Sequence, residues 1–232
     1  MSEDHRLVPQ LSTRSNAIIT SVDWLFEPSW RGERLLARLS ADNVELIDRY
    51  GEPAGDALAE VAEVLLPAVD ADQAVIDGIW TAQPFIGTGS AAQHLAEALA
   101  ENGLAGELPD PIETEKRRAF VAIDLLELDG QVLHDIPFGE RRRLLESVID
   151  ESVRVRVTPA VRVPIGHWVS AWSSSGFSHY VAKHVNSRYT PGEQCDDWLE
   201  ISVEHEPGPS MIGRLLGQRP KRAARIEDLP RR

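Results

Sequence analysis

The chain has 232 residues, 42% of them hydrophobic and 26% charged, which fits one large globular domain or two small ones. Its single cysteine, Cys195, excludes an internal disulfide, and no Cys/His set has zinc-ligand spacing, so we expect no metal site. The net charge of −13 argues against a main surface that binds nucleic acid, because such affinity comes largely from Lys and Arg side chains. No apolar run approaches a membrane span and the polar start is unlike a secretory signal, so we expect a cytoplasmic protein without membrane contact.

The charge is unevenly distributed along the chain. Residues 211–232 carry seven basic side chains against two acidic ones, a net charge of +5 that leaves −18 on the remaining 210 residues. We expect residues 205–232 to form a basic, flexible and solvated tail. The alternative is an arm that binds nucleic acid or an acidic partner, although nucleic acid is not expected on the acidic body.

The first half of the chain alternates strand and helix patterns. Residues 1–20 are polar and predict an irregular lead-in. Loosely alternating apolar residues predict strands over residues 22–26, 34–39, 43–49 and 74–80. Helical spacing predicts a helix over residues 56–69, with Asp56 as its N-cap. A second, alanine-rich helix over residues 90–102 ends at Gly103 and precedes a Gly/Pro-rich acidic loop.

The second half continues this mixture. Residues 118–126 predict a buried strand, followed by a turn at Asp129-Gly130, and Pro137 begins a helix with one apolar face. Further strands are expected within residues 153–163, 177–184 and 198–203, and a short helix over residues 165–174. We therefore expect residues 21–204 to be one α+β domain with mainly antiparallel sheets and packed helices.

Residues 27–34 read Glu-Pro-Ser-Trp-Arg-Gly-Glu-Arg. This segment resembles the first motif of the adenylation (nucleotidyltransferase) domain of ATP-dependent DNA ligases, which is typically Glu-Pro-Lys-Trp-Asp-Gly-Tyr-Arg. In that family the lysine amine attacks the α-phosphate of ATP and carries AMP as a phosphoramidate. The resemblance assigns Ser29 to the lysine position and Arg31 to an acidic one, so the nucleophile position is vacated.

The resemblance extends in order from Trp24 to Ser202. It is carried by the segments Asp48–Gly51, Ile76–Ile79, Phe120–Gly130, Gly176–Lys183 and Ser187–Gly192. It implies the ligase-type adenylation fold. The OB-fold that follows this domain in the family needs more than the roughly 30 residues after Trp198, so we expect none here.

The same resemblance implies which site residues remain and which are replaced. Glu27 and Arg34 correspond to residues at the adenine and ribose, and Arg49 and Lys183 are also retained. The family's carboxylates, adenine-stacking ring and phosphate-binding lysines are replaced, at Ile79, Ser178, Ile123, Glu200 and Ser202. A glutamate at position 200 would repel a triphosphate.

Each retained residue also has a simpler interpretation. Arg34 and Arg49 are equally consistent with ion pairs to the chain's many acids and with residual nucleotide contact. Lys183 is expected to be a solvated strand lysine, with a phosphate contact or a displaced nucleophile as the alternatives.

The losses concern attack, charge neutralisation and leaving-group stabilisation, which all serve one reaction. We therefore expect a catalytically inactive, DNA ligase-like protein without cofactors that acts as a binding or regulatory partner of other proteins. One alternative is a divergent ATP-dependent DNA ligase or nucleotidyltransferase of DNA repair or recombination. It would require ATP and Mg²⁺ and would use Lys183 or a lysine from a partner. The other is a non-catalytic nucleotide-binding module.

Overall fold

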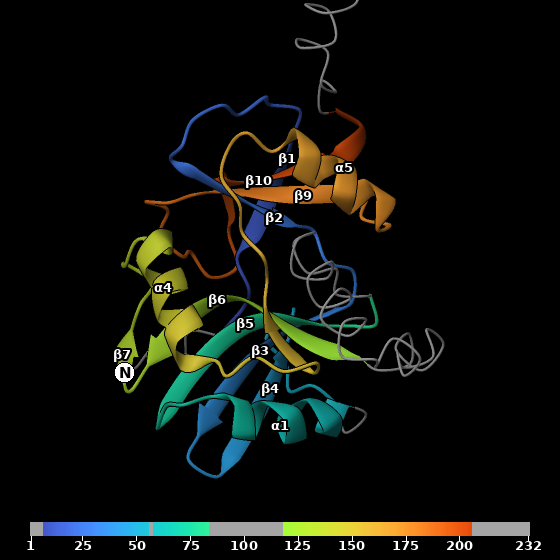
Figure 1. Ribbon diagram of the computed structural model, residues 1–232. Helices are drawn as coiled ribbons and strands as arrows, with labels where there is room; N and C mark the ends of the chain where they lie inside the picture. The colour runs from blue at the N-terminus through green and yellow to red at the C-terminus, as the bar shows by residue number, and fades with distance from the viewer. Residues whose placement is uncertain (1–6, 56–57, 84–117, 206–232) are drawn as a thin grey trace, which may run out of the picture.

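The computed structural model describes residues 7–55, 58–83 and 118–205, whose strands form two sheets lying one above the other (Figure 1). The small sheet has the strand order β1-β10-β9-β2. Its strands are β1 (Leu11–Ser15), β10 (Gln194–Ser202), β9 (His179–His184) and β2 (Trp24–Pro28). Only the β1–β10 pair in this sheet is parallel.

The large sheet has the order β4-β3-β5-β6-β7, and β8 lies parallel beside β6. Its strands are β4 (Asn43–Asp48), β3 (Glu33–Ser40), β5 (Gln73–Thr81), β6 (Ala119–Leu128), β7 (Gln131–Val132) and β8 (Val155–Val157). The other pairings are antiparallel. This arrangement confirms the predicted α+β class and its mainly antiparallel sheets.

The three α-helices of the described ranges pack against the two sheets. α1 (Ala59–Leu65), continued by the short turn η2 (Leu66–Ala68), packs Val61 and Leu65 into the core of the large sheet. α4 (Phe138–Val148) lies along β6, and α5 (Gly166–Ser174) packs against the small sheet. A final turn, η3 (Val203–His205), follows β10. None of the helices in the described ranges is long and apolar enough to cross a membrane.

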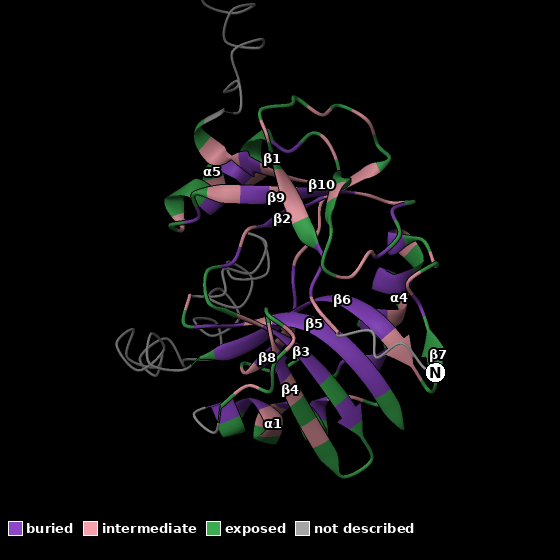
Figure 2. Ribbon diagram, turned by 180° about the vertical axis from the view of Figure 1, so that it is seen from behind, coloured by how far each residue is buried: buried purple, intermediate pink, exposed green. Residues whose placement is uncertain are grey.

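The central strands β5 and β6 are buried along most of their length, as Figure 2 shows. One face of β6 presents Phe120 and Ala122 to the core beneath the large sheet, and the other presents Val121 and Ile123 to the core of the small sheet. Their near-continuous apolar sequences follow from this two-sided burial. The space between the sheets is therefore walled by side chains of both.

Several predicted elements differ from the observed ones. The segment expected to be an irregular lead-in contains β1, because pairing with β10 gives it strand structure that its polar sequence does not suggest. The first helix is shorter than expected, and its predicted N-cap, Asp56, lies outside the described residues. Residues 153–163 form only β8 and an isolated bridge at Val161. The predicted helix over residues 90–102 and the basic tail also lie outside the described residues.

The described strands all belong to the two sheets and their bridges, and none of them forms an OB-fold. The proposed domain boundaries after residues 20 and 204 remain predictions.

Candidate functional site

A cavity of about 210 Å³ lies between the two sheets. Seven strands, from β1 to β10, contribute to its wall together with the loop after β2. The lining residues are Ser12, Glu27, Pro28, Ser29, Trp30, Gly32, Arg34, Ile79, Ile123, Val181, Lys183, Trp198 and Glu200. The structure thus brings Ser29 together with three of the four candidate nucleotide-binding residues, Glu27, Arg34 and Lys183.

Glu27 is buried and accepts from two cations. Its Oε1 accepts from the Nη1 of Arg142 at 3.0 Å, and its Oε2 lies 2.9 Å from the Nζ of Lys183. Arg142 also donates to the carbonyl oxygen of Thr158 at 2.7 Å, and its Nε lies 2.8 Å from Glu146. A buried charge is tolerated when it is paired and hydrogen-bonded, and Glu27 meets both conditions.

Lys183 is not the solvated strand lysine that the sequence predicts, since only 2% of its side chain is exposed. Besides its contact with Glu27, its Nζ donates to the carbonyl oxygen of Ile123 at 2.9 Å. The ammonium also lies 4.7 Å from the ring centroid of Phe138 and 4.1 Å from that of Trp198. Partners on α4, β2, β6 and β10 therefore hold it in the interior.

Arg34 forms an interstrand ion pair, one of the two interpretations that the sequence left open. Its Nε and Nη2 donate to the two carboxylate oxygens of Asp77 on β5, at 3.0 and 2.7 Å. Burial alone would lower the pKa of Arg34, but the charge and hydrogen bonds of Asp77 outweigh it and raise the pKa above its usual value. The Tyr189 hydroxyl donates to Asp77 at 2.8 Å, and burial followed by the charge of Asp77 raises the Tyr189 pKa well above its ordinary value.

Ser29 is bonded to a carboxylate. Its Oγ donates to Oε1 of Glu200 on β10 at 2.9 Å, and the other carboxylate oxygen lies 3.8 Å from the Nε of Arg14. The Ser29 backbone N–H donates to the carbonyl oxygen of His179, which fixes the segment against β9. Gly32 completes this turn at a φ of 154°, where an added Cβ would lie 2.3 Å from the carbonyl oxygen of Trp80.

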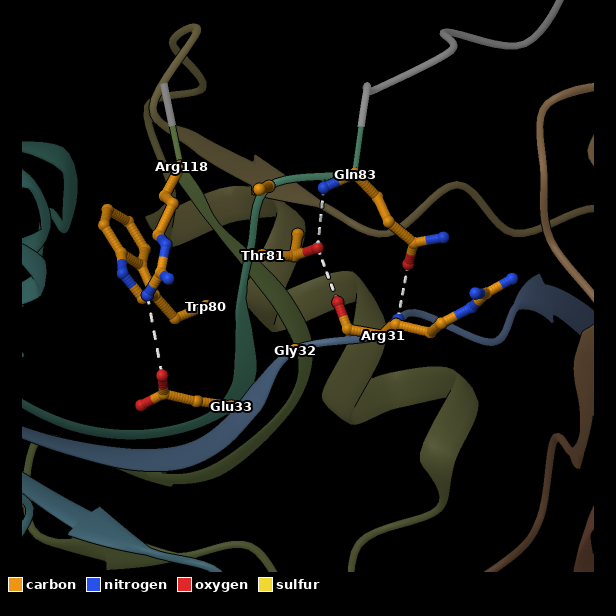
Figure 3. Close-up of a pocket in the computed structure, with 8 residues that line it drawn as sticks. Arg31, Gly32, Glu33, Trp80, Thr81, Gln83 and Arg118 are labelled. Atoms are coloured by element: carbon orange, nitrogen blue, oxygen red, sulfur yellow. Dashed lines mark hydrogen bonds and ion pairs between the residues drawn. The ribbon is translucent and has the colours of Figure 1, made fainter. Parts of the chain in front are cut away.

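Arg31, at the position where the family has an acid, faces away from this cavity. It lines a separate, more open cavity of about 580 Å³ (Figure 3), where the Thr81 hydroxyl donates to the Arg31 carbonyl at 2.6 Å. The Arg31 backbone N–H donates to Oε1 of Gln83. Its guanidinium reaches the carbonyl oxygen of Gly176 at 2.7 Å. Arg31 therefore anchors the loop after β2.

The other replaced positions lie in three different surroundings. Ile79 and Ile123 line the cavity as apolar wall, and no aromatic ring stands at 123. Ser202 lines a third cavity, of about 210 Å³, which shares Glu200 with the inter-sheet cavity. The Ser178 hydroxyl lies 3.0 Å from Nδ1 of His179.

Arg49 is the one candidate residue that this cavity does not include. It is exposed after the end of β4, donates to the Tyr50 hydroxyl at 2.5 Å and lies 4.7 Å from the centroid of that ring. The partner of Arg49 within the described residues is thus Tyr50, and both the ion pair and the nucleotide contact considered for Arg49 stay predictions.

Two buried arginines of α4 were missed by sequence reasoning. Arg141 donates to both carboxylate oxygens of Asp124, at 2.9 and 2.7 Å, and both side chains are fully buried. Arg142 holds Glu27, as described above. A signal existed, because Arg141 and Arg142 lie three and four residues after the buried Phe138 and so share its helix face. Within the described ranges no group of three or more His, Cys, Asp or Glu side chains could hold a metal ion.

Comparison with known proteins identifies this architecture. A family model described as the ATP dependent DNA ligase domain matches residues 9–201. The LigD end-joining DNA repair protein of Mycobacterium tuberculosis is 30% identical over 204 residues, which is 85% of this chain and 24% of LigD. A DNA ligase of Thermococcus onnurineus is 25% identical over 186 residues, 78% of this chain and 32% of that ligase. The chain thus spans about a quarter to a third of the length of these relatives.

Solved structures give the same result. The ligase domain of M. tuberculosis LigD superposes with a TM-score of 0.59 at 25% identity, covering 85% of this chain and 60% of that domain. A mycobacterial DNA ligase D complexed with ATP and MES gives a TM-score of 0.58 at 26% identity, covering 86% and 61%. This chain belongs to the ATP-dependent DNA ligase adenylation-domain family, and it has a serine where the motif resemblance assigns the nucleophilic lysine.

Proposed function

We propose that this chain is an adenylation-domain homologue that does not transfer nucleotides and serves as a binding or regulatory partner of other proteins. The observation that carries the proposal is the hydrogen bond from Ser29 to Glu200. It joins the position of the family's nucleophile to a position of its phosphate-binding lysines. Since the relatives include a protein named for end-joining DNA repair, we place the partnership in DNA repair.

The serine corner (Arg14, Ser29 and Glu200) is poorly suited to the family reaction. A serine hydroxyl needs a general base and would give an ester with AMP in place of the phosphoramidate. Glu200 presents a carboxylate where the phosphates would pass, and like charges repel strongly in a partly desolvated cavity. The residues present therefore do not fit a bound triphosphate.

Lys183 is an unsuitable substitute nucleophile. Its Nζ lies 2.9 Å from the carboxylate of Glu27 and donates to the carbonyl oxygen of Ile123, so it would have to leave both partners to attack a phosphate. Removing Lys183 from these partners would leave Glu27 with Arg142 alone. This cost argues against the divergent-ligase alternative in which Lys183 acts.

A second candidate function is non-catalytic nucleotide binding. Glu27 and Arg34 still line the cavity, with apolar walls from Ile79 and Ile123. Against it, the cavity volume of about 210 Å³ is below the roughly 300–1,000 Å³ of typical small-molecule sites.

The adduct assay separates these functions. The full chain is incubated with α-labelled ATP and Mg²⁺, and covalently bound label is measured after denaturation, beside an active ligase as positive control. We expect no label on the wild-type chain and none on Ser29→Lys, because Glu200 remains in that variant. Labelling of the wild-type chain would overturn the proposal, and its loss in Lys183→Met would identify Lys183 as the nucleophile.

Nucleotide binding is tested on the same protein by thermal unfolding. A ligand that binds only the folded state at a hundred times its Kd stabilises it by about 2.7 kcal/mol. We expect no change in Tm with millimolar ATP or AMP. A saturable rise in Tm that disappears in Arg34→Met would favour the nucleotide-binding module.

A further inference from the structure

Glu200 is the acid of the inter-sheet cavity with the weakest counter-ion. Among the described lining residues, Glu27 has two buried cationic partners, and Arg34 is matched by Asp77. Glu200 has Arg14 at 3.8 Å, and the side chain of Arg14 is 88% exposed, that of Glu200 25%. Exposed pairs at this distance contribute little, so Glu200 can accept a further cation.

The surroundings of Glu200 suit a basic side chain. Glu200 lines both the inter-sheet cavity and the third cavity, whose other lining residues are Arg14, Ser15, Asn16, His179 and Ser202. The inter-sheet cavity offers apolar walls at Ile79, Ile123 and Trp30. Lysine and arginine lay an apolar stem along such walls and place their charge at a carboxylate and hydroxyls.

We propose that this site binds a Lys or Arg side chain from residues 211–232 of the same chain. Glu200 is two residues from the end of β10, the described structure ends at His205, and residues 211–232 follow His205 after a linker of five residues. Arg214 follows His205 by nine residues, which span up to about 30 Å when extended.

Charge and tethering favour this occupant over a separate partner. Residues 211–232 carry seven basic side chains, whereas the chain as a whole has a net charge of −13. A segment tethered by a short linker acts at an effective concentration on the order of millimolar, which a free basic partner rarely reaches. This contact does not depend on catalytic inactivity, because it concerns only which cation pairs with the Glu200 carboxylate.

The test is a double-mutant cycle in the full-length chain. Four proteins are compared: wild type, Glu200→Gln, a tail variant with the seven basic residues of 211–232 changed to Gln, and the combination. Glutamine keeps an acceptor for Ser29, so folding is preserved. We expect each change to lower Tm at low salt, and the combined loss to be smaller than the sum by a few degrees. In 1 M NaCl this coupling should disappear.

A matched control is Asp197→Asn, an exposed acid on the same strand. Additive effects of Glu200→Gln and the tail variant would overturn the proposal, as would equal coupling for Asp197→Asn, which would indicate a diffuse charge effect. Coupling that vanishes on dilution would show that the occupant comes from a second copy and would overturn the intramolecular contact.

Carbodiimide cross-linking gives an independent readout, because Lys221 is the one lysine in residues 211–232. We expect a Glu200–Lys221 amide within the monomer, detected by mass spectrometry and absent in Glu200→Gln. Cross-links from Lys221 that form only to other acids would contradict the assignment.

Discussion

The two sides of the inter-sheet cavity differ in how completely their charges are paired. The ion-pair network (Glu27, Arg34, Asp77, Arg142 and Lys183) is held by bonds of 2.7 to 3.0 Å between largely buried side chains. The serine corner depends on one hydroxyl bond and a 3.8 Å contact to an exposed arginine. Since removing one partner from a buried pair is costly and a surface pair is worth little, the first side constrains the fold far more than the second.

This difference means that substitutions at the serine corner would disturb the fold less than substitutions among the buried ion pairs. Glu27, Arg34 and Lys183 have structural partners whether or not a nucleotide binds. Lys183 connects the small sheet to β6 through the Ile123 carbonyl oxygen, Glu27 connects it to α4 through Arg142, and Arg34 pairs with Asp77 within the large sheet. Ser29 and Glu200 carry little of the packing, so the chemistry at these positions can change at small structural cost. The presence of Glu27, Arg34 and Lys183 is therefore weak evidence for nucleotide binding.

The largest loss of stability is expected at the buried ion pair between Arg141 and Asp124. Arg141→Met leaves Asp124 charged and buried, and should lower the free energy of unfolding by about 3–5 kcal/mol. Urea denaturation measures this loss. The matched control on the same helix is Arg143→Met, whose pair with Glu140 is 63% and 48% exposed, and it should cost under about 1 kcal/mol. Equal losses in the two variants would contradict the contrast between buried and exposed pairs.

A smaller loss is expected from Lys183→Met. The substitution preserves an apolar stem between Phe138 and Trp198 but leaves Glu27 with Arg142 as its cation. Because Glu27 keeps one cationic partner, we expect the free energy of unfolding to fall by about 2–3 kcal/mol, measured by urea denaturation. A change within about 0.5 kcal/mol, as is usual for surface substitutions, would return Lys183 to the solvated role that its sequence suggested.

These expectations show what the sequence could and could not predict. β5 and β6 were predictable because their apolar runs reflect burial on both faces. β1 was not, since its strand structure comes from pairing with β10, nearly two hundred residues away. The burial of Lys183 could not be predicted for the same reason, because the groups that hold it come from four other elements. The local sequence pattern indicates burial and secondary structure, but it does not indicate which distant residue will pair with a charged side chain.

At the serine corner, Ser29→Ala should lower the free energy of unfolding by about 0.5–1.5 kcal/mol, the net contribution of one partly exposed hydrogen bond. The Glu200 carboxylate keeps access to solvent in this variant, so no buried charge is left unpaired. Thermal unfolding at low and high salt measures the loss. A loss as large as that of Lys183→Met would mean that the two sides of the cavity do not differ.

The smallest expected effect is a pH dependence from His134, which lies stacked on Tyr189 with ring centroids 5.6 Å apart. Burial, followed by the charge of Arg141, lowers the pKa of His134 from its ordinary value near 6.5. The unfolded chain therefore takes up a proton near pH 6.5 that the folded chain does not bind until lower pH. Stability from this residue is present in full above pH 6.5 and is lost as pH falls below it.

The variant His134→Gln removes this titration. The difference in Tm between wild type and variant should be constant from pH 8 to about 7 and should shift against the wild type as pH falls toward 5. The effect is small because the His134 ring is only half buried, so solvent reaches the ring and weakens its interaction with Arg141. A difference in Tm that stays constant from pH 8 to pH 5 would show that His134 has no measurable coupling to the buried Arg141.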